Sequence, residues 1–171
     1  MVVIRGFAPV AGPNARILIL GSMPGRKSLA DQQYYAHPRN AFWKIAGELF
    51  HFDPSLPYED RKQALVAAGV ALWDVMARCE RASSLDSDIV ESTIVANDFE
   101  GFLGQHAGIR SVFFNGQKAF QSYRRYVEPV LPDSQGKALL QLPSTSPANA
   151  GMSIAEKQSA WRRLILPHLS A

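Results

Sequence analysis

The stretch that decides the fold is residues 17–43, ILILGSMPGRKSLADQQYYAHPRNAFW. It opens with four aliphatic residues, 17–20, a run typical of a strand that is buried on both faces of a parallel sheet. Residues 21–25 then form a turn, in which Pro24 fixes φ and the glycines let a ligand approach the backbone closely. Ligands of open α/β sheets bind outside the carboxyl ends of the strands, so this turn is the predicted floor of a binding site.

Strand-like and helix-like patterns alternate along the rest of the chain. Short apolar runs predict three further strands, at residues 70–73, 109–114 and 138–142. Periodic or capped segments predict helices at residues 41–52, 58–68, 94–106 and 117–126, and a last one towards residue 168 that a capping box opens at Ser153 and Glu156. Three segments are expected to be irregular: a lead-in loop at 1–15, a polar loop at 26–40, and a functional, lid-like loop at 74–88.

This alternation predicts the fold class, α/β, as a three-layer α/β/α sandwich with a central four-stranded parallel sheet. The length of 171 residues predicts a single domain over residues 1–171. Three of the four strands run into turns of small residues, which begin at Gly21, Asn115 and Ser144. All three turns are expected at one edge of the sheet, and that edge is the predicted site.

The composition excludes several classes of site. The single cysteine, Cys79, leaves no intrachain disulfide and no multi-cysteine metal site, and the four histidines are not spaced as metal ligands. We therefore expect no metal and no cofactor. The net charge of +3 permits nucleic-acid binding without demanding it. With no membrane-length apolar run and no recognisable signal peptide, we expect a cytoplasmic monomer that has no membrane partner.

The segment from Gly21 to Ser28 invites comparison with a nucleotide-binding P-loop. That motif needs four residues between its glycines and a lysine directly after the second glycine. Here three residues separate Gly21 from Gly25, and Arg26 precedes Lys27. Nucleotide hydrolysis is therefore not expected.

Three segments, in order, resemble the motifs of the uracil-DNA glycosylase superfamily. Residues 21–25, GSMPG, match its G-x-[D/N/M]-P turn, and residues 37–44, HPRNAFWK, match its H-P-x-N-x-F-W-K segment. Residues 144–148, STSPA, look like its C-terminal H/N-P-S-[P/G]-L motif. The resemblance spans about residues 6–168. The GSMPG form is most similar to the hypoxanthine (deoxyinosine)-DNA glycosylase branch, together with LWDV at 72–75, SLD at 84–86 and FNG at 114–116.

The resemblance implies Asn40 as the catalytic residue. The best-known members use an Asp or Asn before the proline of the first motif to position or activate the attacking water. This chain has Met23 there, whose sulfur is only a weak acceptor. In the similar branch the asparagine of H-P-x-N takes the leading role, which corresponds to Asn40. Its amide can hold water or hydrogen-bond the base or sugar; alternatively Asn40 caps the helix at Ala41, and both roles can hold together.

The same resemblance implies a set of residues around the flipped base. Tyr35 corresponds to the aromatic residue that stacks on the base in relatives, the alternative being a packing tyrosine. Ser22 and Met23 are expected to contribute backbone groups and pocket wall. Trp73 would either line the pocket or belong to the core. Asn115 would either pair with the base edge or serve as an ordinary turn residue.

The C-terminal motif is expected to contact DNA. Ser144, Thr145 and Ser146 offer hydroxyls and backbone N–H groups to phosphates. The wedge that enters the base stack would be the segment 147–150, that is Pro147, Ala148, Asn149 and Ala150; since Ala148 is small, the filling role shifts to Asn149. The alternative is an ordinary loop before a capped helix. Basic residues near the site in sequence that could contact phosphate are Arg26, Lys27, Arg39 and Lys44.

The expected activity is that of a monofunctional DNA glycosylase. It would flip out and remove hypoxanthine from deoxyinosine in double-stranded DNA containing deaminated bases, starting base excision repair without strand nicking. Hypoxanthine and uracil share a carbonyl acceptor beside an N–H donor, so a uracil or mismatch-specific uracil-DNA glycosylase is an alternative. Met23 makes a catalytically inactive damage-binding module a second alternative. A third is a small-molecule nucleosidase or nucleotide-binding protein, indifferent to polymeric DNA.

Overall fold

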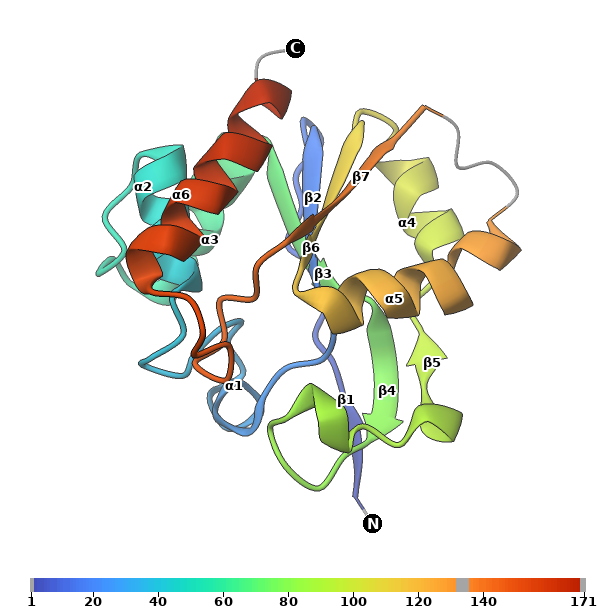
Figure 1. Ribbon diagram of the computed structural model, residues 1–171. Helices are drawn as coiled ribbons and strands as arrows, with labels where there is room; N and C mark the ends of the chain where they lie inside the picture. Colours follow the sequence, from blue (N-terminus) through green and yellow to red (C-terminus); the bar gives the residue numbers. More distant parts are fainter. Residues whose placement is uncertain (1, 132–135, 170–171) are drawn as a thin grey trace.

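A four-stranded parallel sheet forms the centre of the molecule (Figure 1). The computed structural model describes residues 2–131 and 136–169. The strands are β2 (Ile17–Gly21), β3 (Val70–Asp74), β6 (Ser111–Asn115) and β7 (Ala138–Leu142), in the spatial order β3-β2-β6-β7. Every residue of β2, β3 and β6 is buried, which explains why these strands are nearly continuous apolar runs. The predicted fold class and the four predicted strands are confirmed.

Helices cover both faces of this sheet (Figure 1). One layer contains α2 (Phe42–Phe50), α3 (Tyr58–Ala67) and α6 (Ile154–Ile165), and the other contains α4 (Phe99–Gln105) and α5 (Gln117–Tyr126). Side chains alternate along a strand, so Ile19 of β2 packs in the core of the first layer and Leu20 in that of the second. No helix in the described part of the chain is long and apolar enough to cross a membrane.

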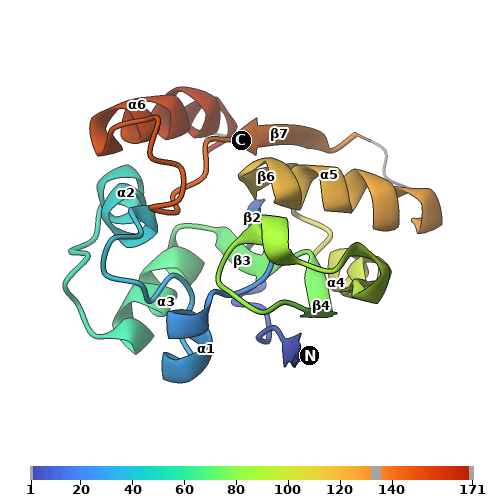
Figure 2. The ribbon, with the colours of Figure 1, turned by 60° about the horizontal axis from the view of Figure 1, so that its bottom comes forward.

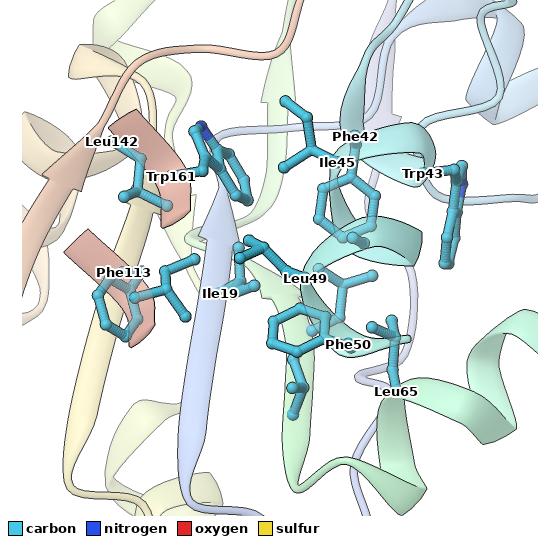
Figure 3. Packing of buried hydrophobic residues seen from close by; sticks show 14 of the residues in the cluster. Ile19, Phe42, Trp43, Ile45, Leu49, Phe50, Leu65, Phe113, Leu142 and Trp161 are labelled. Carbon is cyan, nitrogen blue, oxygen red and sulfur yellow. The ribbon is translucent and has the colours of Figure 1, made fainter. Parts of the chain in front are cut away.

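The core of the first layer also fixes the segment that leaves β7. Figure 3 shows Ile19 and Phe113 of the sheet facing Phe42 of α2 and Trp161 of α6. All four side chains are fully buried. The indole N–H of Trp161 donates to the carbonyl oxygen of Pro143 at 2.8 Å. The packing of α6 therefore holds the chain directly after β7.

A second, antiparallel sheet shows that two of the expected loops were wrong. β1 (Val3–Arg5) pairs with β4 (Met76–Glu80), which in turn pairs with β5 (Val95–Ala96). The segments 1–15 and 74–88 therefore contain strands. These strands have 3, 5 and 2 residues and β1 has no buried residue, so neither a continuous apolar run nor a sustained alternation marks them. Their stability comes from pairing between segments far apart in sequence.

The helices differ from expectation in two places. The helix expected over 94–106 begins only at Phe99, because Asp98 Oδ1 accepts the N–H of Gly101 at 3.0 Å and caps it. A short helix, α1 (Arg26–Asp31), lies within the expected polar loop. The capping box of α6 is confirmed. Single turns of 3₁₀ helix complete the list: η1 (Asp86–Asp88), η2 (Glu91–Thr93), η3 (Glu128–Val130) and η4 (Leu166–His168).

The register of the central sheet brings the strand ends together at one edge. Gly21 lies opposite Asp74, and Asn115 lies opposite Leu142. Figure 2 brings this side of the molecule forward and shows α1, the segment before α6 and the turn after β4 arranged around it. The turns of small residues therefore meet at one edge, as predicted.

Candidate active site

A cavity of about 380 Å³ opens at the carboxyl edge of the sheet. Its size is within the usual range for small-ligand sites. It is bounded by parts of four segments, 21–28, 34–40, 84–87 and 144–149, together with Asp74 and Asn115 at the ends of β3 and β6. The site residues predicted from the sequence that line it are Ser22, Met23, Tyr35, Asn40, Asn115, Ser144, Thr145, Ser146, Pro147, Ala148 and Asn149.

Trp73 is a core residue and does not line this cavity. Its ring packs on Phe99 and Phe102, with centroids 5.0 and 4.8 Å away, and its indole N–H donates to the carbonyl oxygen of Phe7 at 3.0 Å. These contacts lie on the face of the sheet covered by α4. Because side chains alternate along β3, the following residue, Asp74, faces the cavity instead.

The segment that follows β4 is fastened to the turn after β2 by side chains. Ser22 Oγ donates to Asp86 Oδ1 at 2.6 Å. Arg81 is only 4% exposed, and its Nη2 donates to the carbonyl oxygen of Pro24 at 2.6 Å. Arg81 Nε also donates to the carbonyl oxygen of Ser83. One wall of the cavity is thus built from part of the segment 74–88, which was expected to be a functional, lid-like loop.

Gly21 is at a position where no side chain fits. A Cβ placed on it would lie 2.5 Å from Asp74 Oδ1, closer than real Cβ contacts allow, and would make a tight contact of 3.0 Å with the hydroxyl oxygen of Tyr35. Both polar groups therefore lie directly over the backbone of Gly21. Met23, two residues on, packs against Met76 and neighbours beneath the second sheet while also lining the cavity.

Tyr35 holds its ring in an unusual backbone conformation. Its φ is +55°, a region that non-glycine residues rarely adopt. The ring stacks on Phe42, with centroids 4.2 Å apart and an interplanar angle of 22°. Its hydroxyl is buried without a hydrogen-bond partner in the described structure, and burial raises its pKa well above the usual range for tyrosine. One face of the ring is therefore covered, and a ligand can stack only on the other.

The side-chain carbonyl oxygen of Asn40 fixes the start of α2. Asn40 Oδ1 accepts the N–H of Phe42, the first residue of α2, at 3.0 Å, while the N-cap position itself is Ala41. Within the described residues the side-chain NH₂ of Asn40 has no hydrogen-bond partner, which leaves two donors for a ligand in the cavity that it lines. The next residue, Ala41, donates its N–H to the carbonyl oxygen of Thr145 at 3.0 Å and so joins the two motif segments.

Asn115 and Thr145 form a two-way hydrogen-bonded pair. Asn115 Nδ2 donates to Thr145 Oγ1 and Asn115 Oδ1 accepts the N–H of Thr145, both at 2.9 Å. Thr145 is 1% exposed. The amide of Asn115 is therefore largely committed to positioning the C-terminal motif. The side chain of Thr145 is not at the surface, where the expected phosphate contact would require it.

The segment 144–149 is stabilised by its own polar groups. Ser144 Oγ accepts the N–H of Ser146, and Ser146 Oγ accepts the N–H of Ala148, both at 3.1 Å. Asn149 Nδ2 donates to the carbonyl oxygen of Ser144 at 3.1 Å, so its amide is not free to fill a base stack. Ala148 is exposed at the tip. From below, the buried Lys157 of α6 donates to the carbonyl oxygen of Ser146 at 3.1 Å.

Asp74 is the most deeply buried acidic residue of the cavity, and it was not among the site residues predicted from the sequence. It is 4% exposed, and its Oδ2 is buried without a hydrogen-bond partner in the described part of the chain. The pKa of its carboxyl is raised from 3.8 to about 7: burial raises it most, the charge of Asp86 also raises it, and that of Arg81 lowers it. The signal was present in the sequence, because Asp74 is a charged residue directly after the buried run 70–73.

Two basic side chains lie in the exposed part of the cavity lining, where Asp86 is also exposed. They are Arg26 and Lys27 at the start of α1. Lys27 also pairs with Asp31 at 3.2 Å. The other two basic residues considered from the sequence, Arg39 and Lys44, are exposed but do not line the cavity. No group of three His, Cys, Asp or Glu residues that could hold a metal ion occurs in residues 2–131 and 136–169.

Comparison with known proteins identifies the family. Residues 8–169 match the family model described as the uracil DNA glycosylase superfamily. The chain belongs to this superfamily. It is thus a DNA glycosylase by class, with DNA as its class of substrate. The three segments that resemble the superfamily's motifs all contribute residues to the lining of the cavity.

The relatives within the superfamily agree in length and fold. The chain is 35% identical over 158 residues to a hypoxanthine DNA glycosylase of Methanosarcina barkeri and 37% identical over 158 residues to one of Methanosarcina acetivorans. Each match covers 92% of this chain and 94% of the relative. A solution NMR structure of a candidate uracil DNA glycosylase from Methanosarcina acetivorans superimposes with a TM-score of 0.76, at 36% identity, over 95% of this chain and 99% of the other.

Proposed function

We propose that this DNA glycosylase removes hypoxanthine from deoxyinosine in double-stranded DNA and leaves an abasic site for later steps of base excision repair. The observation that carries the proposal is the free NH₂ group of Asn40 in the same cavity as the Tyr35 ring and the segment 144–149. The names of the two Methanosarcina relatives support the choice of base. The protein is expected to act as a monomer and without a metal or cofactor.

Negative charge develops on the departing base and positive charge on the sugar, and both need stabilisation. Water adds to C1′ of the sugar as the bond from C1′ to N9 breaks; the departing base takes the bonding electrons and finally the proton of the water. Donors aimed at the base stabilise its developing negative charge. We assign this role, or the holding of the water, to the NH₂ group of Asn40. Stacking on the free face of Tyr35 adds about 1–3 kcal/mol of binding to the base.

Access to the lesion requires base flipping. A base within a duplex must leave the stack to reach a cavity of this depth, and a mispaired base costs least to extrude. We propose that the exposed tip around Ala148 lies against the opened stack, while the hydroxyl hydrogens of Ser144 and Ser146 point to phosphates. Their oxygens already accept backbone N–H groups, so these hydroxyls are held in position as donors.

The test uses matched duplexes that contain deoxyinosine, deoxyuridine or no lesion, with EDTA present. Abasic sites are detected by alkaline cleavage under single-turnover conditions. Wild type is expected to cleave at deoxyinosine, and Asn40→Ala is expected to lose at least about a hundredfold in rate, the usual size of a lost electrostatic donor. Asn14→Ala is the matched control, because Asn14 is an exposed asparagine before the opposite end of β2 and is expected to leave the rate unchanged.

Other outcomes separate the alternatives. A preference for deoxyuridine would indicate that the substrate base is uracil instead of hypoxanthine, bound in the same cavity. Binding to lesion duplexes without cleavage, equal for wild type and Asn40→Ala, would indicate a damage-binding module. Cleavage of free nucleosides with no salt-dependent binding of DNA would indicate a nucleosidase.

A further inference from the structure

The carboxyl group of Asp74 is left without a partner by everything described so far. Its Oδ2 has no hydrogen bond among residues 2–131 and 136–169, although the side chain lies in the polar cavity. A buried polar group without a partner destabilises the folded protein, so the presence of Asp74 at this position calls for a ligand that satisfies it. The hydroxyl of Tyr35, which lies over the same backbone at Gly21, is also unpartnered.

Asp74 lies where the edge of an inserted base would arrive. It is the last residue of β3 and is opposite Gly21, which has no side chain in the way. Residues at the mouth, such as Ala148 and Lys27, are exposed, whereas Asp74 is among the most deeply buried polar residues of the cavity. The sugar of an inserted base stays nearer to the mouth. The edge of the base that points away from the sugar therefore reaches Asp74.

The neighbouring polar groups of the cavity are already engaged. The amide of Asn115 is paired with Thr145, and the hydroxyl of Ser22 is paired with Asp86. Asn40 has only its NH₂ group free, and that group donates. A base edge with an N–H beside a carbonyl needs an acceptor and a donor side by side. Asp74 and the Tyr35 hydroxyl are the two cavity groups that are buried and unpaired in the described structure, and only a neutral carboxyl carries a donor and an acceptor on two separate oxygens side by side.

The charged and titratable groups that face Asp74 come from three segments. Asp86 of η1 disfavours its ionisation, Arg81 after β4 favours it, and burial disfavours it most. Tyr34 and Tyr35 face it as neutral hydroxyls, because burial raises the pKa of both far above neutrality. The net result is a carboxyl pKa of about 7, so the neutral acid is well populated at physiological pH.

We propose that Asp74 recognises the deaminated base as a neutral carboxylic acid, its O–H donating to the base carbonyl and its C=O accepting the adjoining N–H. For hypoxanthine these atoms are O6 and N1–H, and for uracil an equivalent pair exists. The O–H donor also stabilises negative charge that spreads onto the carbonyl oxygen as the base departs. An ionised carboxylate has acceptors only, faces that oxygen with lone pairs, and opposes the charge of the leaving base.

The test compares Asp74→Asn with Asp74→Ala over pH 5.5 to 9 on the duplexes described above. Asparagine keeps one donor and one acceptor in the same shape and cannot ionise, whereas alanine keeps neither. The wild-type single-turnover rate is expected to fall about tenfold per pH unit above pH 7, as expected for one essential proton. Asp74→Asn is expected to stay within about tenfold of the wild-type rate at pH 6 and to lose this fall, while Asp74→Ala loses about a hundredfold throughout.

Two results would overturn this role. One is a wild-type rate that rises with pH through neutrality; the other is an Asp74→Asn variant as inactive as Asp74→Ala although it still folds by thermal unfolding. Either would show that the ionised carboxylate is the working form. Asp74→Asn is the informative variant, because it preserves size if Asp74→Ala proves unstable.

This role rests on the proposed function, and a binding measurement separates the two. Duplexes with a non-cleavable 2′-fluoro analogue of deoxyinosine or deoxyuridine are titrated by fluorescence anisotropy at pH 6 and pH 8.5. Wild type is expected to bind the lesion about tenfold more weakly at the higher pH, and Asp74→Asn equally at both; pH-independent wild-type binding would contradict the role. The binding result tests the role of Asp74 even if no base is excised. In that case only the proposed function fails.

Discussion

At the scale of single residues, Asp74 links the stability of the protein to pH. Its carboxyl pKa is 3.8 in an unfolded chain and about 7 in the folded one, so between these values the folded chain binds more protons. The stabilisation from this group is therefore fully present below pH 3.8 and is lost as the pH rises to about 7. Asparagine at this position cannot ionise and does not incur this loss.

Asp74→Asn is accordingly expected to gain stability relative to wild type as the pH rises. The difference in free energy of unfolding between variant and wild type should grow by about 2–3 kcal/mol between pH 5 and pH 8, at about 1.4 kcal/mol per pKa unit. Urea denaturation at the two pH values measures it. A difference that stays constant between the two would contradict a buried, titrating Asp74.

Tyr35 provides a second prediction at this scale. Its ring stacks on Phe42 and its hydroxyl has no described hydrogen-bond partner. Tyr35→Phe keeps the ring and is expected to bind the non-cleavable lesion duplex within about fivefold of wild type. Tyr35→Ala removes the stacking surface and should weaken binding by about 1–3 kcal/mol, measured by anisotropy. Equal losses in both variants would mean that the hydroxyl, and not the ring, carries the contact.

At the scale of elements, α6 supports the cavity from outside it. Its capping box at Ser153 and Glu156 fixes the first turn, and further along Lys157 and Trp161 hold the segment that leaves β7. Ser153→Ala is expected to lower the free energy of unfolding by about 1 kcal/mol. Ser159→Ala, at an exposed position in the same helix, is the control and should change it by less than about 0.5 kcal/mol. Chemical denaturation distinguishes the two, and equal effects would contradict a specific role of the cap.

The elements that the sequence predicts well are those whose pattern comes from burial. β2, β3 and β6 are buried on both faces, so each is a run of apolar residues that is visible without the structure. The strands of the second sheet are too short for a pattern, and pairing across distant segments creates them. The turn after β4 was expected to be a lid, yet Ser22 and Arg81 fasten it to the rest of the cavity.

The same distinction holds for the cavity. Its segments were predictable, because motif resemblance and strand ends both indicate the edge at Gly21, Asn115 and Ser144. The side-chain directions were not. Trp73 and Asp74 are adjacent, and only the register of β3 shows that the first packs in the core and the second faces the cavity. The partners of Asn115 and Thr145 likewise depend on contacts between segments 30 residues apart.

At the scale of the whole molecule, the charge distribution governs binding to DNA. The net charge is only +3, so attraction to the phosphates depends on cations near the cavity rather than on the total. Lys27→Ala is expected to reduce the slope of log affinity against log salt by about one for any duplex. Lys62→Ala is the control: Lys62 also carries an ion pair, with Glu59 at 3.0 Å, but lies on α3 away from the cavity lining. An unchanged slope for Lys27→Ala would exclude a phosphate contact there.

The hydrogen bond from Ala41 to Thr145 also has a consequence for how the protein is made. Translation delivers Tyr35, Asn40 and Asp74 early, but the wall opposite them belongs to the segment after β7, which packs only once α6 exists. A nascent chain therefore has no enclosed cavity until α6 has left the ribosome. Synthesis itself therefore delays the capacity to excise bases until α6 has been made, and chains that terminate before α6 are expected to lack the activity.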